Sequence, residues 1–229
     1  MIRLRSNDAI HTRPQLASAR MPVANARCIA GAPAVARIAS NTSVNVTARI
    51  RERSAVPLLL FTYLNPVVRY GLERLAAGAA RAGIDGCLLT DASVEEAQSY
   101  TEAMHRHGLD TVFLAAPTST PRRMRLVAHY SSGFVYLVSR TGVTGERESL
   151  SDAVAPLVRG MRAITDLPLA VGFGISRPAH VAELGRQVEA VVVGSAFVRI
   201  VERHGGEPDV EARLEAFARE LKGGFGESV

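Results

Sequence analysis

Several residue types and patterns are scarce or absent in this chain of 229 residues, and some of these absences exclude a class of protein. Tryptophan is absent, and lysine occurs once, as Lys222 near the C-terminus. The two cysteines, Cys28 and Cys87, follow no recognisable signal peptide, so we expect free thiols in a reducing compartment rather than a disulfide framework. No apolar run approaches the ~20 residues of a membrane span, so we expect no membrane association.

The positive charge of the chain is concentrated near its N-terminus. The formal net charge is +5 at pH 7, yet residues 1–53 hold nine arginines against only Asp8 and Glu52. The remainder is therefore slightly acidic. Because no basic stripe with interleaved aromatic residues occurs outside this region, we expect no nucleic-acid partner.

Residues 1–48 show no clean strand followed by a phased helix. They are rich in Ala, Ser, Asn and Arg and poor in acids, which is also a composition found in organelle transit peptides. The plainer interpretation is an aberrant or poorly ordered N-terminal segment. We therefore predict two regions, this segment at 1–48 and a β/α barrel domain at 49–229.

We predict that a helix ends within residues 49–54. After it, apolar runs alternate with helical patterns. The runs are continuous rather than alternating, which is typical of parallel strands buried on both faces. We predict six strands, at 56–63, 86–91, 111–116, 134–139, 168–171 and 190–193. Helices are predicted at 70–82, from Ser93 as the N-cap to 108, and at 121–130, 151–164 and 209–222. This alternation predicts a parallel sheet with right-handed crossovers.

Glycine-rich turns follow the last two predicted strands, at Gly172, Gly174 and Gly194-Ser195. Such turns expose backbone N–H groups that suit a phosphate, and the last two strands of a β/α barrel are the usual phosphate site. A doubly wound sheet is disfavoured because no GxGxxG follows a first strand. The fold class predicted is therefore α/β, a (β/α)8 TIM barrel. Strands three to eight are recognisable, whereas strands one and two are degenerate or missing.

Four motifs together resemble the tryptophan synthase α-subunit family. They are FTYLNPVVRYG at 61–71, GFVYLVSRTGVTG at 133–145, VGFGIS at 171–176 and VVVGSAFV at 191–198, and the resemblance covers about residues 49–202. It implies a cytoplasmic lyase of tryptophan biosynthesis that splits indole-3-glycerol phosphate into indole and glyceraldehyde 3-phosphate. It also implies an α2β2 assembly with a β subunit that carries pyridoxal phosphate, with no cofactor or metal in this chain.

The resemblance further implies a set of substrate-binding residues. Phe61, Leu88, Leu114 and Tyr136 would wall the indole pocket, and Thr144 would lie on a closing lid. Gly145, Gly174 and Ser195 would hold the phosphate, with Gly172, Phe173 and Gly194 beside them.

The catalytic carboxylates of that family have no recognisable counterpart here. The best local alignment places Pro14 where a Glu belongs and Asn25 where an Asp belongs, so the catalytic residues are unknown and impaired turnover is expected. Asp91, at the end of its predicted strand, is either a substitute carboxylate or a structural cap of the helix that follows. His105 and His107 point in different directions on one helix and are interpreted as solvated rather than metal-binding.

Three functions stay open at the level of sequence. The first is the lyase subunit, and the second is a non-catalytic relative that keeps the phosphate site and binds or activates a β subunit through a face near Asn65-Pro66. The third is another phosphate-binding barrel, such as an isomerase or aldolase. It is disfavoured because Lys222 is the only lysine that could form a Schiff base.

Overall fold

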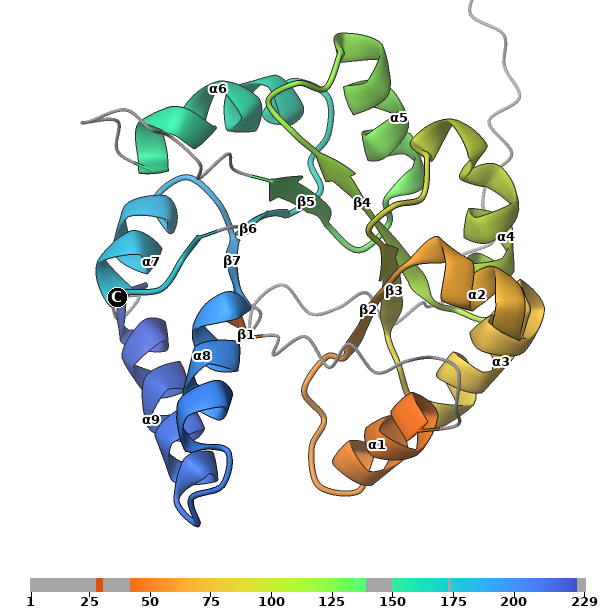
Figure 1. The fold of residues 1–229 in the computed structure, drawn as a ribbon. Coiled ribbons are helices and arrows are strands. Elements are labelled where there is room, and N and C mark those ends of the chain that lie inside the picture. Colours follow the sequence, from red (N-terminus) through yellow and green to blue (C-terminus); the bar gives the residue numbers. More distant parts are fainter. Residues whose placement is uncertain (1–27, 31–41, 139–149, 173, 226–229) are drawn as a thin grey trace, which may run out of the picture.

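The computed structural model describes residues 28–30, 42–138, 150–172 and 174–225. Within these ranges, seven parallel strands form one curved sheet with the order β1-β7-β6-β5-β4-β3-β2 (Figure 1). The strands are β1 Cys28–Ala30, β2 Leu59–Thr62, β3 Gly86–Leu89, β4 Asp110–Ala115, β5 Val135–Val138, β6 Leu169–Gly172 and β7 Ala190–Val193. The two end strands of the sheet are therefore β1 and β2.

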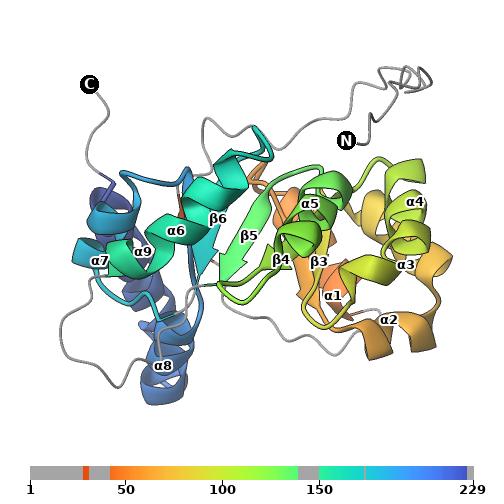
Figure 2. The same ribbon diagram turned by 90° about the horizontal axis from the view of Figure 1, so that it is seen from above.

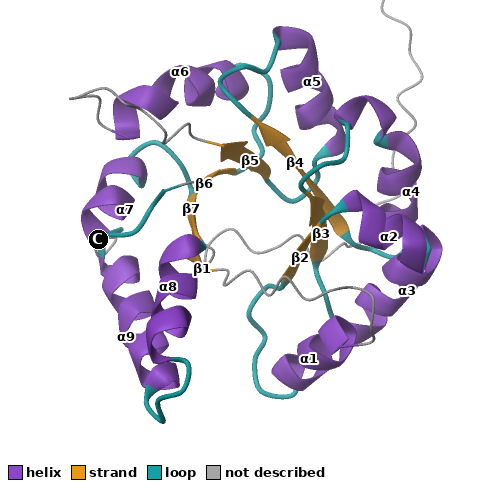
Figure 3. Ribbon diagram, viewed as in Figure 1, coloured by secondary structure: helices purple, strands orange, loops and turns teal. Residues whose placement is uncertain are grey.

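Helices surround the sheet on its outer side, as Figures 1 and 3 show, and Figure 2 gives the same arrangement from above. They are α1 Thr42–Arg51, α2 Leu64–Tyr70, α3 Leu72–Ala82, the 3-10 turn η2 Val94–Glu96, α4 Gln98–Arg106, α5 Pro121–Tyr130, α6 Leu150–Arg162, α7 Pro178–Leu184, α8 Ser195–His204 and α9 Val210–Gly223. This is the architecture of a β/α barrel, with helices outside and strand ends facing a common mouth.

Side chains alternate between the two faces of each strand, and both faces are apolar. In β4, Phe113 belongs to the large core between sheet and helices, whereas Val112 belongs to a smaller cluster on the inner face. This inner cluster consists of Leu88, Val112, Phe134, Tyr136, Ala170 and Ala190. Burial on both faces explains why the strands appear as unbroken apolar runs in the sequence.

An acidic side chain at the N-terminal edge of the sheet fixes the register of β2 and β3. The backbone N–H of Leu58, just before β2, donates to Asp85 Oδ2 at 2.7 Å, and Arg51 pairs with the same carboxylate. Arg51 also donates from Nε to the carbonyl of Gly83 at 2.6 Å. One arginine at the end of α1 thereby joins that helix to the start of the sheet.

The same arrangement recurs at β6 and β7. The N–H of Leu169 donates to Glu189 Oε2 at 2.8 Å, and Arg162 of α6 pairs with that carboxylate while donating to the carbonyl of Leu167 at 3.1 Å. In both places, an acid just before one strand accepts a backbone N–H at the start of the preceding strand, from Leu58 and from Leu169. Charged residues on this edge therefore serve stability, which leaves the opposite edge for ligands.

The six strands predicted from residue 56 onward are confirmed, with ends that differ by up to three residues. Two helices were not predicted, α2, which includes Asn65 and Pro66, and α8. The predicted cap at Ser93 was wrong, because its side chain makes no cap hydrogen bond and its hydroxyl donates to Glu95 Oε2 at 2.5 Å. The bond to the carboxylate two residues away orients the Ser93 hydroxyl toward Glu95, away from the backbone N–H groups of the first turn.

The N-terminal region contributes more regular structure than its sequence suggested. Residues 28–30 form β1, which pairs in parallel with β7, and α1 begins at Thr42 and ends at Arg51. The other residues of 1–48 lie outside the described ranges, so the character of that segment stays a prediction.

Candidate functional site

Two aromatic side chains meet at the mouth of the sheet, although their strands are separated by two others. Phe61 of β2 and Tyr136 of β5 have ring centroids 6.2 Å apart with an angle of 63° between the ring planes. Phe61 is 39% exposed, whereas Tyr136 is buried. The pair therefore forms an apolar wall with one open side, which suits a flat aromatic ligand.

Strand register adds the two predicted leucines to this wall. Leu88 lies opposite Phe61 in the β2–β3 pairing, and Leu114 lies opposite Tyr136 in the β4–β5 pairing. Leu88 is fully buried, and Leu114 is half-buried against the same inner cluster. All four residues predicted to surround an indole ring therefore lie on one face of the sheet.

The Tyr136 hydroxyl lies over a glycine in the neighbouring strand. A Cβ atom built on Gly172 of β6 would fall 2.0 Å from Tyr136 Oη, so this tyrosine orientation requires the glycine. Burial raises the pKa of Tyr136 to about 12. The side chain is consequently a neutral phenol at physiological pH and can offer a hydrogen bond but no negative charge.

The predicted phosphate-binding positions follow β6 and β7, which are neighbours in the sheet. Gly174 has φ +74° in the left-handed region, where other residues are strained. Gly194 is the N-cap of α8, and exposed Ser195 is the first residue of that ten-residue helix. The N–H groups of a first helical turn have no intrahelical partner and attract anions.

Several predicted site residues cannot be placed. Phe173, Thr144 and Gly145 lie outside the described residues, and so do Pro14 and Asn25. Among the described residues, no group of three or more His, Cys, Asp or Glu side chains could hold a metal ion. The described part of the chain also contains no helix long and apolar enough to cross a membrane.

Asp91 has a structural partner, but a different one from that predicted. Its Oδ1 accepts the backbone N–H of Leu64 at 2.6 Å, so it stabilises the start of α2 rather than the helix that follows its own strand. The two residues are 27 positions apart, and only the pairing of β2 with β3 brings them together. Its carboxylate is exposed, and an exposed carboxylate at a helix N-terminus is an ordinary stabilising feature.

Sequence reasoning missed three aliphatic residues of the same wall. Leu59, Val138 and Val192 are half-buried and pack against the inner cluster. Two of them could have been found from the strand period of two, since Leu59 precedes Phe61 by two positions and Val138 follows Tyr136 by two.

The helix that follows β2 presents apolar side chains to solvent beside this mouth. Tyr63, the N-cap residue of α2, is 52% exposed, and Val68 within α2 is 66% exposed. Asn65 is exposed on the same helix, and Pro66 is half-buried. Neighbouring exposed apolar residues of this kind often mark a protein interface.

Comparison with known proteins gives a consistent result. The family model for the tryptophan synthase alpha chain matches residues 22–225, a wider region than the sequence motifs alone suggested. The tryptophan synthase alpha chain of Solibacter usitatus is 74% identical over 183 residues, which cover 80% of this chain and 68% of that protein. The alpha chain of Geotalea uraniireducens is 46% identical over 175 residues, or 76% of this chain and 65% of that protein. This chain thus spans about two thirds of these relatives.

Solved structures show the same likeness in three dimensions. A chain in the tryptophan synthase a2b2 complex of Pyrococcus furiosus superposes with a TM-score of 0.73 at 37% identity, covering 79% of this chain and 73% of that one. The separate A-subunit from the same organism gives a TM-score of 0.72 at 36% identity, with coverages of 80% and 73%. The predicted α/β barrel class is therefore confirmed. The chain belongs to the tryptophan synthase alpha chain family, a family of lyases that cleave indole-3-glycerol phosphate in tryptophan biosynthesis.

Proposed function

We propose that this chain binds indole-3-glycerol phosphate at the mouth of its sheet and acts as an alpha-subunit lyase with impaired turnover. One observation carries the proposal. The aromatic and aliphatic wall of Phe61, Leu88, Leu114 and Tyr136 adjoins the glycine-rich end of β6 at Gly172, through the contact of Tyr136 with that glycine. An indole ring and a phosphate three carbons away need such a combination of an apolar wall beside backbone donors.

The phosphate is assigned to the ends of β6 and β7 and to the segment after β5. Gly174 and Ser195 would hold it through backbone N–H groups, with Gly172 and Gly194 beside them. Gly145 and Phe173 complete the set by resemblance, and Thr144 would cover the bound substrate as part of a lid.

Cleavage itself needs two proton transfers. The bond between indole C3 and the glycerol carbon breaks as a proton is delivered to C3, while a base removes the proton of the glycerol hydroxyl that becomes the aldehyde. Carboxyl groups suit both tasks because their pKa values can be separated by environment. Proline at position 14 and asparagine at position 25 can do neither, and each missing acid–base group lowers a rate by about 10²–10⁴-fold.

A β subunit is the proposed partner, in an α2β2 assembly, because one structural relative belongs to a tryptophan synthase a2b2 complex. The face around Asn65 and Pro66, with exposed Tyr63 and Val68 beside it, is the proposed contact surface. Pyridoxal phosphate would be held only by that partner, and a cytoplasmic location follows from the pathway.

The test is indole release from indole-3-glycerol phosphate, measured with and without a β subunit. We expect substrate binding with turnover well below that of the Solibacter usitatus relative. Turnover equal to that relative would contradict the proposed impairment. Stimulation of the β subunit without any indole release would favour the second candidate function, a non-catalytic activating module, since the wall and phosphate positions are kept while the carboxylates are not recognisable.

The phosphate assignment has its own variant. Ser195→Asp adds a negative charge at the first residue of α8, where the helix dipole tolerates it, so the fold should persist. The same charge would repel a phosphate and weaken substrate binding by at least about tenfold. Ser99→Asp adds that charge at an exposed position of α4 and serves as the matched control. Equal affinity of the two variants would remove Ser195 from the site.

A further inference from the structure

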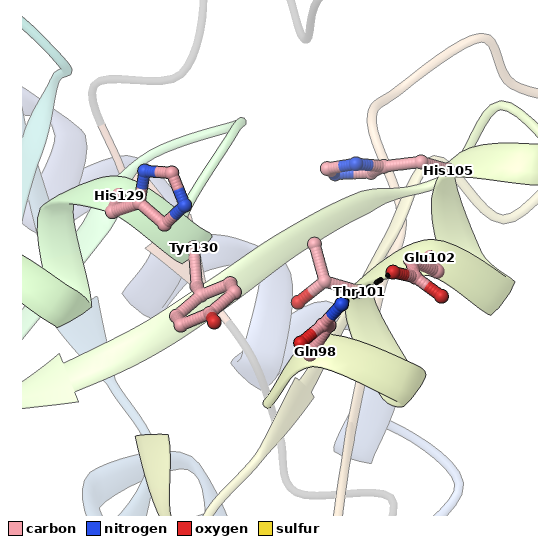
Figure 4. Close-up of a pocket in the computed structure, with 6 residues that line it drawn as sticks. All are labelled: Gln98, Thr101, Glu102, His105, His129 and Tyr130. Carbon is pink, nitrogen blue, oxygen red and sulfur yellow. Dashed lines mark hydrogen bonds between the residues drawn. The ribbon is translucent and has the colours of Figure 1, made fainter. Parts of the chain in front are cut away.

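A cavity lies in the helical layer, between α4 and α5. Its volume is about 360 Å³, and it is lined by Gln98, Thr101, Glu102, His105, His129 and Tyr130 (Figure 4). None of these residues belongs to the mouth of the sheet. The volume falls within the range of small-molecule sites, and the lining is polar in character.

One hydroxyl in this cavity lacks a hydrogen-bond partner. Thr101 is only 8% exposed, and its Oγ1 is fully buried with no partner among the described residues. Figure 4 shows this oxygen directed into the space between the two helices. A buried hydroxyl without a partner destabilises a protein, and a bound group that accepted its hydrogen bond would remove that cost.

The hydrogen bonds around His105 define its donor nitrogen. The Ser132 hydroxyl donates to Asp110 Oδ1 at 2.8 Å, and the Thr111 hydroxyl donates to the carbonyl of Tyr130 at 2.6 Å. Both hydroxyl hydrogens are therefore used. Nε2 of His105, which lies 3.2 Å from Ser132 Oγ and 3.4 Å from Thr111 Oγ1, is therefore the donor toward these two oxygens.

The α5 side of the cavity is held rigidly. The rings of His129 and Tyr130 contact each other edge to face, with centroids 4.8 Å apart, and Tyr130 also packs against Phe113 at 6.2 Å. Figure 4 shows the Tyr130 phenol facing the residues of α4. The Tyr130 hydroxyl and the His129 imidazole on this side could donate hydrogen bonds to an acceptor in the cavity.

A single negative charge stands on the other helix. Glu102 of α4 accepts from Gln98 Nε2 at Oε1, at 3.0 Å, which orients the carboxylate along the cavity wall. The described residues form no metal-binding group here, and a phosphate would meet the repulsion of this carboxylate. A lone cation would leave the hydroxyl donors unused.

We propose that this cavity binds the head group of a free α-amino acid. The ammonium would pair with Glu102, and the carboxylate would accept from the hydroxyls of Thr101 and Tyr130 and from the His129 imidazole. A zwitterion satisfies both the single carboxylate and the group of neutral donors, including the orphaned hydroxyl. Neither charge of the ligand is then buried without a partner.

The experiment uses the whole chain and three small probes. Glycine, ethylamine and acetate are titrated separately at pH 8, and the histidine ring resonances are followed by NMR. We expect saturable binding of glycine that is at least about tenfold tighter than that of either half-probe, the effect of one additional charge-assisted hydrogen bond. Equal affinities for glycine and acetate, or for glycine and ethylamine, would overturn the proposal, as would the absence of saturable binding.

Variants test whether the unpaired Thr101 hydroxyl and Glu102 bind a ligand or whether the cavity has no ligand. Glu102→Gln should weaken glycine binding about tenfold or more, whereas Glu220→Gln, an exposed position of α9, should leave it unchanged. Thr101→Val removes the unpaired hydroxyl at constant shape. It should raise the Tm of the free protein yet weaken glycine binding, and Thr101→Ser should retain binding. Unchanged binding in Thr101→Val or in Glu102→Gln would refute the assignment.

Discussion

Gly172→Ala tests how tightly the ligand wall is packed. The added Cβ would fall 2.0 Å from Tyr136 Oη, 2.5 Å from Tyr136 Cζ and 3.1 Å from Val192 Cβ. Contacts between non-bonded heavy atoms are favourable near 3.5–4.0 Å, so the overlap with the phenol exceeds 1 Å. The tyrosine or the strand must move.

Neither movement is easy. Strand β6 is paired with β5 on one side and β7 on the other, so its backbone is held in both directions. Tyr136 is buried within the inner cluster. Overpacking of this kind costs about 1–3 kcal/mol, and we expect Gly172→Ala to lower the free energy of unfolding by an amount near the top of that range.

A double-mutant cycle in urea isolates the contact. Tyr136→Leu removes both phenol atoms that overlap, so Gly172→Ala should cost at least about 1 kcal/mol less in that background. Tyr136→Phe removes Oη but leaves Cζ at 2.5 Å from the added carbon, so relief should be partial. Additive effects of Gly172→Ala and Tyr136→Leu, or a Gly172→Ala variant as stable as the parent, would refute the geometry proposed for this wall.

Three further predictions concern single groups. Asp91→Ala should lower the free energy of unfolding by about 1 kcal/mol through loss of the Leu64 cap, with kcat unchanged; a fall in kcat at equal stability would instead assign Asp91 to catalysis. Burial alone would raise the pKa of Glu189, but hydrogen bonds from Arg162 and Leu169 outweigh it, so the folded pKa is lowered. The stability from this group is present above the unfolded pKa of about 4.3 and is lost as pH falls through the folded pKa. Glu189→Gln should therefore reduce the change in the free energy of unfolding between pH 5 and pH 3, measured by urea unfolding at each pH. Burial raises the pKa of the Cys87 thiol to about 12, so in a Cys28→Ser background an aromatic disulfide reagent should react only as fast as the protein unfolds; rapid labelling of folded protein would contradict this burial.

The sequence located most elements because their signals are local. Continuous apolar runs revealed the six strands from residue 56, and α3 ends at Ala82, as predicted, before Gly83 with φ +81°. The local signal failed at Ser93. Its hydroxyl was predicted to cap a helix by accepting a backbone N–H, but it makes no cap hydrogen bond and donates to the Glu95 carboxylate.

The candidate site was partly predictable for the same reason. The resemblance to the tryptophan synthase α-subunit family implied Phe61, Tyr136 and Gly172 as site residues. Their closeness in space fits the rule that the carboxyl ends of parallel strands share one edge of the sheet. The role of Asp91 was not predictable in detail. Its partner Leu64 is 27 residues away and is reached only across the β2–β3 pairing.

The sequence by itself determined the fold class, the positions of the six strands from residue 56 onward and the residue types at the mouth of the sheet, because these follow from periodicity and from turn chemistry within a few residues. Only the tertiary structure decided which side chains touch. Three features each involve two or more elements of the chain. They are the Tyr136 hydroxyl over Gly172, the carboxylates of Asp85 and Glu189 that bind the start of a neighbouring strand, and the cavity beside Thr101. Such contacts depend on strand register and helix packing, which set the distances between residues of different elements and cannot be inferred from one segment of sequence.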